Sequence, residues 1–117
     1  MKKARERSGR LTAAARRAQL IEVGRSVFAE RGYEATSVEE IAARANVSKP
    51  ILYSHFGGKE GLYAVVVDRE VERILGKITR AVSSGPPRAR LEQAALAYLT
   101  YVKEHPEGFA VLLRDAP

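Results

Sequence analysis

The sequence predicts an all-α protein: a three-helix helix-turn-helix domain followed by a long connecting helix and further helices. Two observations predict this class. Apolar residues recur at intervals of three and four along most of the 117 residues, which is the spacing of one helix face. Short polar stretches that cap or break helices separate these segments. We expect a disordered basic arm over residues 1–11, the helix-turn-helix domain over 12–58, and the connecting helix with the helices after it over 59–117.

The first predicted helix spans about residues 12–31 and supports the two helices that follow. One of its faces is formed by Leu20, Gly24, Val27 and Phe28. A glycine inside a helix costs about 1 kcal/mol relative to alanine, so Gly24 indicates a place where another helix passes close. Gly32 is expected to close the first helix in a left-handed conformation.

Two short helices joined by a tight turn follow, over about residues 37–45 and 48–56. Apolar residues of the first recur at i, i+3, i+4 and i+7, as Val38, Ile41, Ala42 and Ala45. Ser37 is the expected N-cap, and Glu40, three residues later, can complete a capping box. Asn46 tolerates the left-handed backbone that ends a helix. The pair has the geometry that lays its second helix into the major groove of DNA.

The second short helix begins with a charge pattern that indicates an anionic partner. Ser48 is its expected N-cap, and Pro50 suits the first turn. That turn contains Lys49 and no acid, although the positive end of a helix dipole favours negative charge. Lys59 stands in the same way where the next helix begins. A phosphate backbone lying across both helix starts accounts for both lysines; two solvated surface lysines are the alternative.

Residues 16–63 closely resemble the TetR family of bacterial transcriptional regulators. The residues that carry the resemblance are Leu20, Ile21, Phe28, Gly32, Tyr33, Thr36, Ser37, Ile41, Ala42, Val47, Ser48, Leu52, Tyr53, His55, Phe56, Lys59 and Leu62. The resemblance implies phosphate contacts by Ser37, Tyr53, His55 and Lys59, and base-facing positions at Lys49, Pro50 and Ile51. Glu39 stands where the family's namesake has a base-reading arginine, which implies that this contact is absent here.

The predicted DNA-binding residues combine this resemblance with the outward-facing positions of the 48–56 helix. Phosphate contacts position a protein on DNA, whereas contacts to base edges select the sequence. We expect Ser48 to join the phosphate-binding residues, and Ser54 to face outward beside them. The complete set is Ser37, Ser48, Lys49, Pro50, Ile51, Tyr53, Ser54, His55 and Lys59.

A long helix is predicted over about residues 59–82, with one apolar stripe. The stripe consists of Val71, Ile74, Leu75, Ile78 and Val82. Residues 83–87, Ser-Ser-Gly-Pro-Pro, break this helix. Two more helices are expected over about 88–104 and 107–114. The apolar face of the first is Leu91, Ala95, Tyr98, Leu99 and Val102, and the second is expected to turn Phe109, Leu112 and Leu113 inward.

By the resemblance, residues 59–117 form the connecting helix and the first helices of a truncated regulatory domain. This partial ligand-binding and dimerisation region is considerably longer in the family. The usual partners of their apolar faces are missing from the sequence, so we expect exposed apolar surface. A pocket closed on all sides is not expected. Tyr98 and Tyr101 are interpreted as core residues, with the lining of half a pocket as the alternative.

The net charge of +6 is confined to the start of the chain. Residues 1–17 hold seven Lys or Arg and one Glu, whereas the remaining residues hold 13 basic and 13 acidic side chains. Residues 1–11 contain few apolar side chains and are expected to be disordered when free. Such an arm can follow DNA phosphates or enter a minor groove; a solubilising tail is the alternative.

Composition argues against several classes of protein. The chain has no cysteine and therefore neither a disulfide framework nor a thiolate metal site. An apolar run such as Leu62–Val67 is six residues long, whereas about 20 are needed to cross a bilayer. The basic start is not followed by the apolar segment of a secretory signal. We expect a cytoplasmic protein without a membrane partner.

The sequence predicts no enzyme, no cofactor and no metal site. His55 lies near Lys59 and Glu60, but on the outer face of a short helix, where general-base catalysis lacks a concave site. There is no glycine-rich phosphate loop after a strand, no metal-ligand spacing and no nucleophile paired with a base.

Together these observations predict a regulator that binds double-stranded DNA at a palindromic operator as a homodimer. The resemblance implies repression by occupying a promoter, and release by a small-molecule effector in the full-length form. The alternative is a helical protein-interaction module that has lost DNA binding and modulates another regulator. Such a module would show acids or bulky apolar residues on the outer face of the 48–56 helix, and only Ile51 fits that description.

Overall fold

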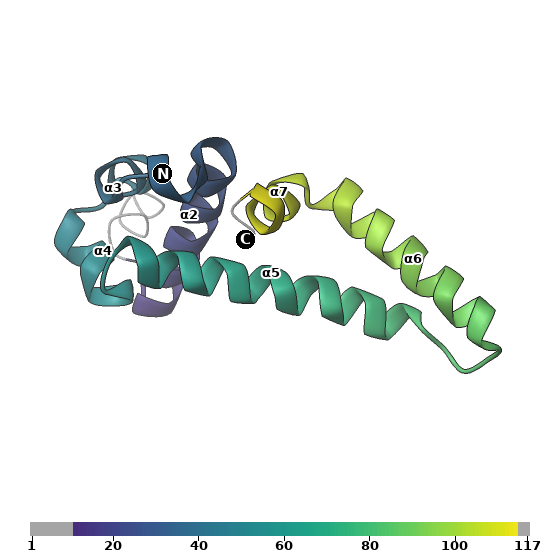
Figure 1. Ribbon diagram of the computed structural model, residues 1–117. Coiled ribbons are helices and arrows are strands. Elements are labelled where there is room, and N and C mark those ends of the chain that lie inside the picture. Colours follow the sequence, from purple (N-terminus) through teal and green to yellow (C-terminus); the bar gives the residue numbers. More distant parts are fainter. Residues whose placement is uncertain (1–10, 115–117) are drawn as a thin grey trace, which may run out of the picture.

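The computed structural model describes residues 11–114, so almost all of the predicted basic arm lies outside the described residues. These residues form six helices and no strand (Figure 1), which confirms the all-α class. The helices are α2 (Ala13–Ala35), α3 (Val38–Ala45), α4 (Lys49–Phe56), α5 (Lys59–Ala81), α6 (Pro87–Glu104) and α7 (Pro106–Arg114). Over the described range, no helix has both the length and the apolar content that crossing a membrane requires.

Helix α2 organises the N-terminal bundle because it packs against α3, α5 and α7. The hydroxyl of Thr12 caps the start of α2 by accepting a hydrogen bond from the amide of Ala15 at 3.1 Å. The core between these helices consists of Leu20, Ile21, Val27, Phe28, Val38, Ile41, Ala42, Ala45, Leu52, Leu62, Val66 and Val111. Burying one large apolar side chain stabilises a fold by roughly 1.5–3 kcal/mol, so this cluster fixes where α3 and α4 sit.

Two glycines in α2 have structural roles that the sequence indicated. A Cβ at Gly24 would lie 2.8 Å from Cδ2 of Leu62, which confirms that α5 passes close to α2 there. Gly32 has φ 80° and ψ 166°, a combination available almost only to glycine. The positive φ of Gly32 was predicted. The predicted left-handed cap is wrong, because ψ of Gly32 lies in the extended range. The chain bends at Gly32 and returns to helical conformation up to Ala35.

Helices α5 and α6 form a long arm that leads away from the bundle (Figure 1). They pack against each other, and α7 then brings the chain back onto α2. The radius of gyration is 17.2 Å, compared with about 13 Å for a compact domain of this length. The arm therefore accounts for the elongated shape, whose principal extents are 54, 36 and 21 Å.

The arm carries the exposed apolar surface that was predicted. Leu75 on α5 is more than half exposed, and so are three leucines of α6, namely Leu91, Leu96 and Leu99. On α7 the prediction was wrong for Leu113, which is 60% exposed. Helix α7 packs inward through Gly108 and Val111, which are three residues apart and therefore share one face of the helix. Leu113 lies two positions after Val111, so its side chain points to a different face.

A buried polar cluster joins the arm to the bundle. Glu70 of α5 is only 2% exposed. The hydroxyl of Tyr101 donates to the Glu70 carboxylate at 2.8 Å, and Nη1 of Arg73 donates to it at 3.2 Å. Arg25 of α2 approaches the same carboxylate to 3.9 Å. Burial and this carboxylate raise the pKa of Tyr101. Tyr101 is a core residue, as interpreted from the sequence, whereas Tyr98, interpreted in the same way, is exposed.

Helix α7 lies against this cluster at Gly108. A Cβ at that position would collide with the Glu70 carboxylate, so only glycine leaves room for it. The side chain of Ser26 on α2 also donates to the carboxylate of Glu107 at 3.0 Å. The cluster therefore ties together α2, α5, α6 and α7 in the part of the molecule where the arm begins.

Candidate nucleic-acid interface

The turn between α3 and α4 has the predicted local structure. Asn46 adopts φ 57° and ψ 46°, the left-handed conformation expected at the end of α3. The amide of Val47 donates to the carbonyl of Ala42 at 3.0 Å, which closes the turn. The hydroxyl of Ser37 accepts from the amide of Glu40 at 3.1 Å, so Ser37 is the N-cap as predicted.

The second half of the expected capping box has a different partner. The carboxylate of Glu40 pairs with Nε of Arg31 at 2.6 Å and with Nη2 of Arg44 at 3.1 Å. Each guanidinium brings a positive charge to the carboxylate as well as a hydrogen bond, whereas a backbone amide brings a hydrogen bond alone. The pair with Arg31 links α3 to the end of α2, and the pair with Arg44 lies within α3.

Helix α2 holds the pair of short helices by their C-terminal ends. Nη1 of Arg17 donates to the carbonyl of His55 at 2.8 Å, and the amide of Gln19 donates to the carbonyl of Ala45 at 3.1 Å. The guanidinium of Arg17 also lies 4.5 Å from the centre of the Phe56 ring. The last carbonyls of a helix have no partner within that helix, so both bonds fix α3 and α4 on α2. Sequence reasoning missed Arg17 and Gln19, which give no local signal.

The nine predicted DNA-binding residues lie at the start of α3, along α4 and at the start of α5, at the end of the molecule opposite the α5–α6 loop (Figure 1). Seven are exposed: Ser37, Ser48, Lys49, Pro50, Ile51, Tyr53 and Ser54. His55 and Lys59 are half-buried. Within α4 only Leu52 is buried, so this eight-residue helix keeps most of its surface accessible.

Ser48, at the N-cap of α4, and Ser54, within α4, differ in what their hydroxyls contact. Ser48 has the extended backbone of an N-cap, but its hydroxyl makes no capping hydrogen bond, contrary to the prediction. The start of α4 is closed instead by backbone bonds from Ile51 and Leu52 to the carbonyl of Ser48. The hydroxyl of Ser54 donates to the carbonyl of Ile51 at 2.8 Å.

The side chain of Lys59 makes contacts within the protein. Its ammonium donates to the carbonyl of Tyr33 at 2.9 Å and lies 4.2 Å from the centre of the Tyr33 ring. The ring of Tyr33 in turn packs against those of Phe28 and Tyr63. An ammonium has three N–H groups, so the bond to Tyr33 uses one of them.

The charge pattern at the start of α4 has a partner inside the protein. Nζ of Lys49 lies 2.8 Å from Oε2 of Glu39, in the first turn of α3. This hydrogen bond raises the pKa of Lys49 and lowers that of Glu39. An external anion was predicted to neutralise this lysine, and in the structure Glu39 does so. The two adjacent acids at the start of α3 were the sequence signal.

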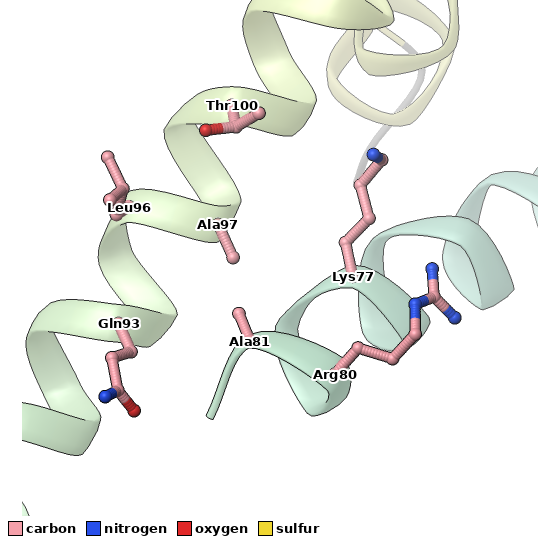
Figure 2. Close-up of a pocket in the computed structure, with 7 residues that line it drawn as sticks. All are labelled: Lys77, Arg80, Ala81, Gln93, Leu96, Ala97 and Thr100. Atoms are coloured by element: carbon pink, nitrogen blue, oxygen red, sulfur yellow. The ribbon is translucent and has the colours of Figure 1, made fainter. Parts of the chain in front are cut away.

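The arm contains a cleft (Figure 2). It has a volume of about 410 Å³ and lies between α5 and α6. Its lining consists of Lys77, Arg80, Ala81, Gln93, Leu96, Ala97 and Thr100. One wall residue, Leu96, is 66% exposed, so the cleft opens to solvent. Over residues 11–114, no three His, Asp or Glu side chains gather as a metal site requires.

Comparison with known proteins places this geometry in a family. The family described as bacterial regulatory proteins, tetR family, matches residues 20–66. The chain is 36% identical over 110 residues to the HTH-type transcriptional activator FasR of Mycolicibacterium smegmatis, a match that covers 93% of this chain and 50% of FasR. It is 37% identical over 78 residues to the HTH-type transcriptional repressor KstR2 of Rhodococcus jostii, covering 66% of this chain and 38% of KstR2.

The fold has the same relatives. It resembles the crystal structure of a TetR-like transcriptional regulator from Rhodococcus sp. RHA1 with a TM-score of 0.84 and 36% sequence identity. That match covers 91% of this chain and 58% of the other. The chain thus spans about half the length of these relatives or less, and they are named as transcriptional regulators, not as enzymes. Through the N-terminal domain at residues 20–66, the chain belongs to the tetR family of bacterial regulatory proteins.

Proposed function

We propose that this protein is a transcriptional regulator that binds double-stranded DNA through α4. The observation that carries the proposal is the outer face of α4, where Leu52 is the buried residue and the polar and basic positions remain accessible. Helix α2 fixes α3 and α4 from the opposite side through Arg17 and Gln19. A short rigid helix presented in this way suits the major groove.

The residues of this face divide into two roles. Lys49, at the start of α4, can donate to O6 and N7 of a guanine, and the side chain of Ile51 can contact a thymine methyl group. Pro50 lies between them and shapes the same contact. We assign phosphate contacts to the residues around them, which position the protein on the duplex. These are Ser37, Ser48, Tyr53, His55 and Lys59, and Ser54 faces outward beside them.

The proposed homodimer, repression and release by an effector are supported by the similarity to the family. A homodimer would place two copies of α4 in successive major grooves, about 34 Å apart, and would therefore read a palindromic operator. Occupying a promoter in this way represses transcription. In the full-length form, the cleft between α5 and α6 supplies one wall of a site for a small-molecule effector that releases the protein from DNA. Such a regulator acts in the cytoplasm, where the bacterial chromosome lies.

Binding-site selection tests the proposal directly. Duplexes with a randomised stretch of about 20 base pairs, long enough for two half-sites one helical turn apart, are passed over the protein and the bound fraction is sequenced. We expect an inverted repeat whose half-site centres are about one helical turn apart. Enrichment of a single unrepeated site would contradict the dimer, and a pool that remains random would contradict sequence-specific binding.

The sign of regulation has a second candidate. FasR, which matches 93% of this chain, is named an activator, whereas KstR2 is named a repressor. A reporter gene with the selected site overlapping its promoter separates the two. We expect expression to fall when the protein is present. A rise with the site placed upstream of the promoter would favour activation through the same DNA contacts.

A further inference from the structure

The ion pair between Glu39 and Lys49 lies on the proposed DNA-binding face. It joins the first turn of α3 to the first residue of α4, with 2.8 Å between Oε2 of Glu39 and Nζ of Lys49. Both side chains are exposed, 65% for Glu39 and 49% for Lys49. Any duplex that lies along α4 meets the carboxylate and the ammonium together.

The Glu39–Lys49 pair contributes little to the stability of the free protein. An ion pair between two exposed side chains contributes little to folding, because water screens the charges and both side chains lose freedom. The neighbouring acid, Glu40, belongs to a separate group with Arg31 and Arg44 on the side of α2. The Glu39–Lys49 pair is therefore a local arrangement of two charges at the point where α3 and α4 begin.

The pair changes what Lys49 offers to DNA. A lysine that is paired with a carboxylate adds no net charge to the face, so it releases no counterion from an arbitrary duplex. A guanine at the right position presents two acceptors, O6 and N7, in the groove. An ammonium has three N–H groups, so it can reach such a base while the carboxylate still holds it. Unmatched DNA does not present this adjacent pair of acceptors at that position and meets a neutral pair.

We propose that Glu39 is a positioning residue for sequence selection: it holds Lys49 and cancels its charge, which weakens binding to unmatched DNA more than binding to the preferred sequence. This inference rests on the proposed function of α4. It assigns a role to a residue that does not itself contact a base, and it makes the discrimination between sequences depend on both partners of the pair.

A double-mutant cycle tests the inference. The proteins are the wild type, Glu39→Gln, Lys49→Ala, the double variant, and Glu72→Gln, which removes one exposed acid from α5 as the control. Each is titrated with a random duplex of about 30 base pairs and with the duplex that the wild type selects from a randomised pool, at two salt concentrations. We expect Glu39→Gln to tighten binding to the random duplex about two- to five-fold, the range of an exposed ion pair.

The other arms of the cycle identify the cause. Glu39→Gln should steepen the salt dependence on the random duplex by about one charge and improve binding to the selected duplex less. In the Lys49→Ala background the same change should have little effect, and Glu72→Gln should resemble the wild type. Equal tightening on both duplexes, or tightening that persists without Lys49, would overturn the inference while DNA binding stands. If the wild type binds neither duplex at low salt, the proposed function fails and this inference fails with it.

Discussion

At the scale of single residues, the hydrogen bond between Tyr101 and Glu70 makes the first prediction. Tyr101→Phe removes the donor that reaches the buried carboxylate at 2.8 Å, and leaving a buried charged acceptor short of a partner costs about 1–3 kcal/mol. Urea unfolding followed by circular dichroism measures the loss. Tyr98→Phe is the matched control, because Tyr98 is 39% exposed on the same helix and should change stability by less than about 0.5 kcal/mol. Equal losses in both variants would contradict the role of the Glu70 contact.

His105 makes the protein less stable at acidic pH. Burial lowers its pKa below the ordinary value of 6.5, and the nearby charge of Arg73, whose Nη1 lies 3.3 Å from Nδ1, acts in the same direction. The unfolded chain therefore takes up this proton first as the pH falls. The stability contributed by neutral His105 is complete above the unfolded pKa and is lost as the pH falls through the lower folded pKa.

Urea unfolding at a series of pH values between about 7.5 and 5 checks this second prediction. His105→Gln should flatten the decline in stability over that range, whereas His55→Gln, the same change at the other histidine, should leave the decline in place. A decline that is unchanged in His105→Gln would show that other groups cause it.

Sequence reasoning was reliable for residues whose role is local. Ser37 as a cap and Asn46 as a helix end follow from the backbone conformations that these side chains favour. It was incomplete for the charges on Lys49 and Lys59. Their partners, Glu39 and the carbonyl of Tyr33, lie 10 and 26 residues away along the chain. Such pairs depend on how helices dock, which a local pattern does not specify.

At the scale of elements, the caps of α3 and α4 should respond differently to the same change. Ser37→Ala removes a capping hydrogen bond of 3.1 Å and should cost about 1 kcal/mol of stability. Ser48→Ala removes a hydroxyl that makes no capping bond, so its cost should stay below about 0.5 kcal/mol. Thermal or urea unfolding compares the two. Because both hydroxyls are assigned to phosphates, both variants should weaken DNA binding; equal losses of stability would show that Ser48 caps after all.

The lysines at the starts of α4 and α5 should affect DNA binding in different ways. Lys49→Ala should lower the preference at one base step by about 1–3 kcal/mol, whereas Lys59→Ala should weaken binding to all sequences and reduce the salt slope by about one. Fluorescence anisotropy with the selected duplex and with single-base variants of it measures both effects. If both substitutions weaken selected and random DNA equally, Lys49 does not read a base.

Helix positions were predicted to within a few residues, because the apolar spacing and the capping residues agree along most of the chain. The exceptions have physical causes. Helix α2 continues past Gly32 because the chain bends there and resumes helical conformation to Ala35. Helix α6 turns Tyr101 inward, while Leu91 and Leu99 of its expected apolar face are exposed. Tyr101 was interpreted as a core residue, but the apolar spacing did not indicate its hydrogen bond to the buried carboxylate of Glu70.

At the scale of the whole molecule, the structure separates the proposed DNA-binding face from the arm. Helix α4 lies at one end, and α5 and α6 extend away from it (Figure 1). The cleft between α5 and α6 and the polar cluster around Glu70 both belong to the arm or to its junction with the bundle. The sequence predicted each helix but not that α7 would fold back onto α2, because this contact depends on Val111 and Gly108 fitting against distant residues.

A salt titration with a random duplex of about 30 base pairs measures whether the bundle binds DNA. The excess positive charge lies in residues 1–17. A variant without residues 1–10 is therefore the control for DNA binding by the basic N-terminal segment alone. Sedimentation of the free protein and of the complex is measured alongside. We predict a steep linear fall of log affinity with log salt that persists in the control, with a dimer on the DNA. Absence of binding at low salt would contradict the account and indicate that the outer face of α4 serves a protein partner.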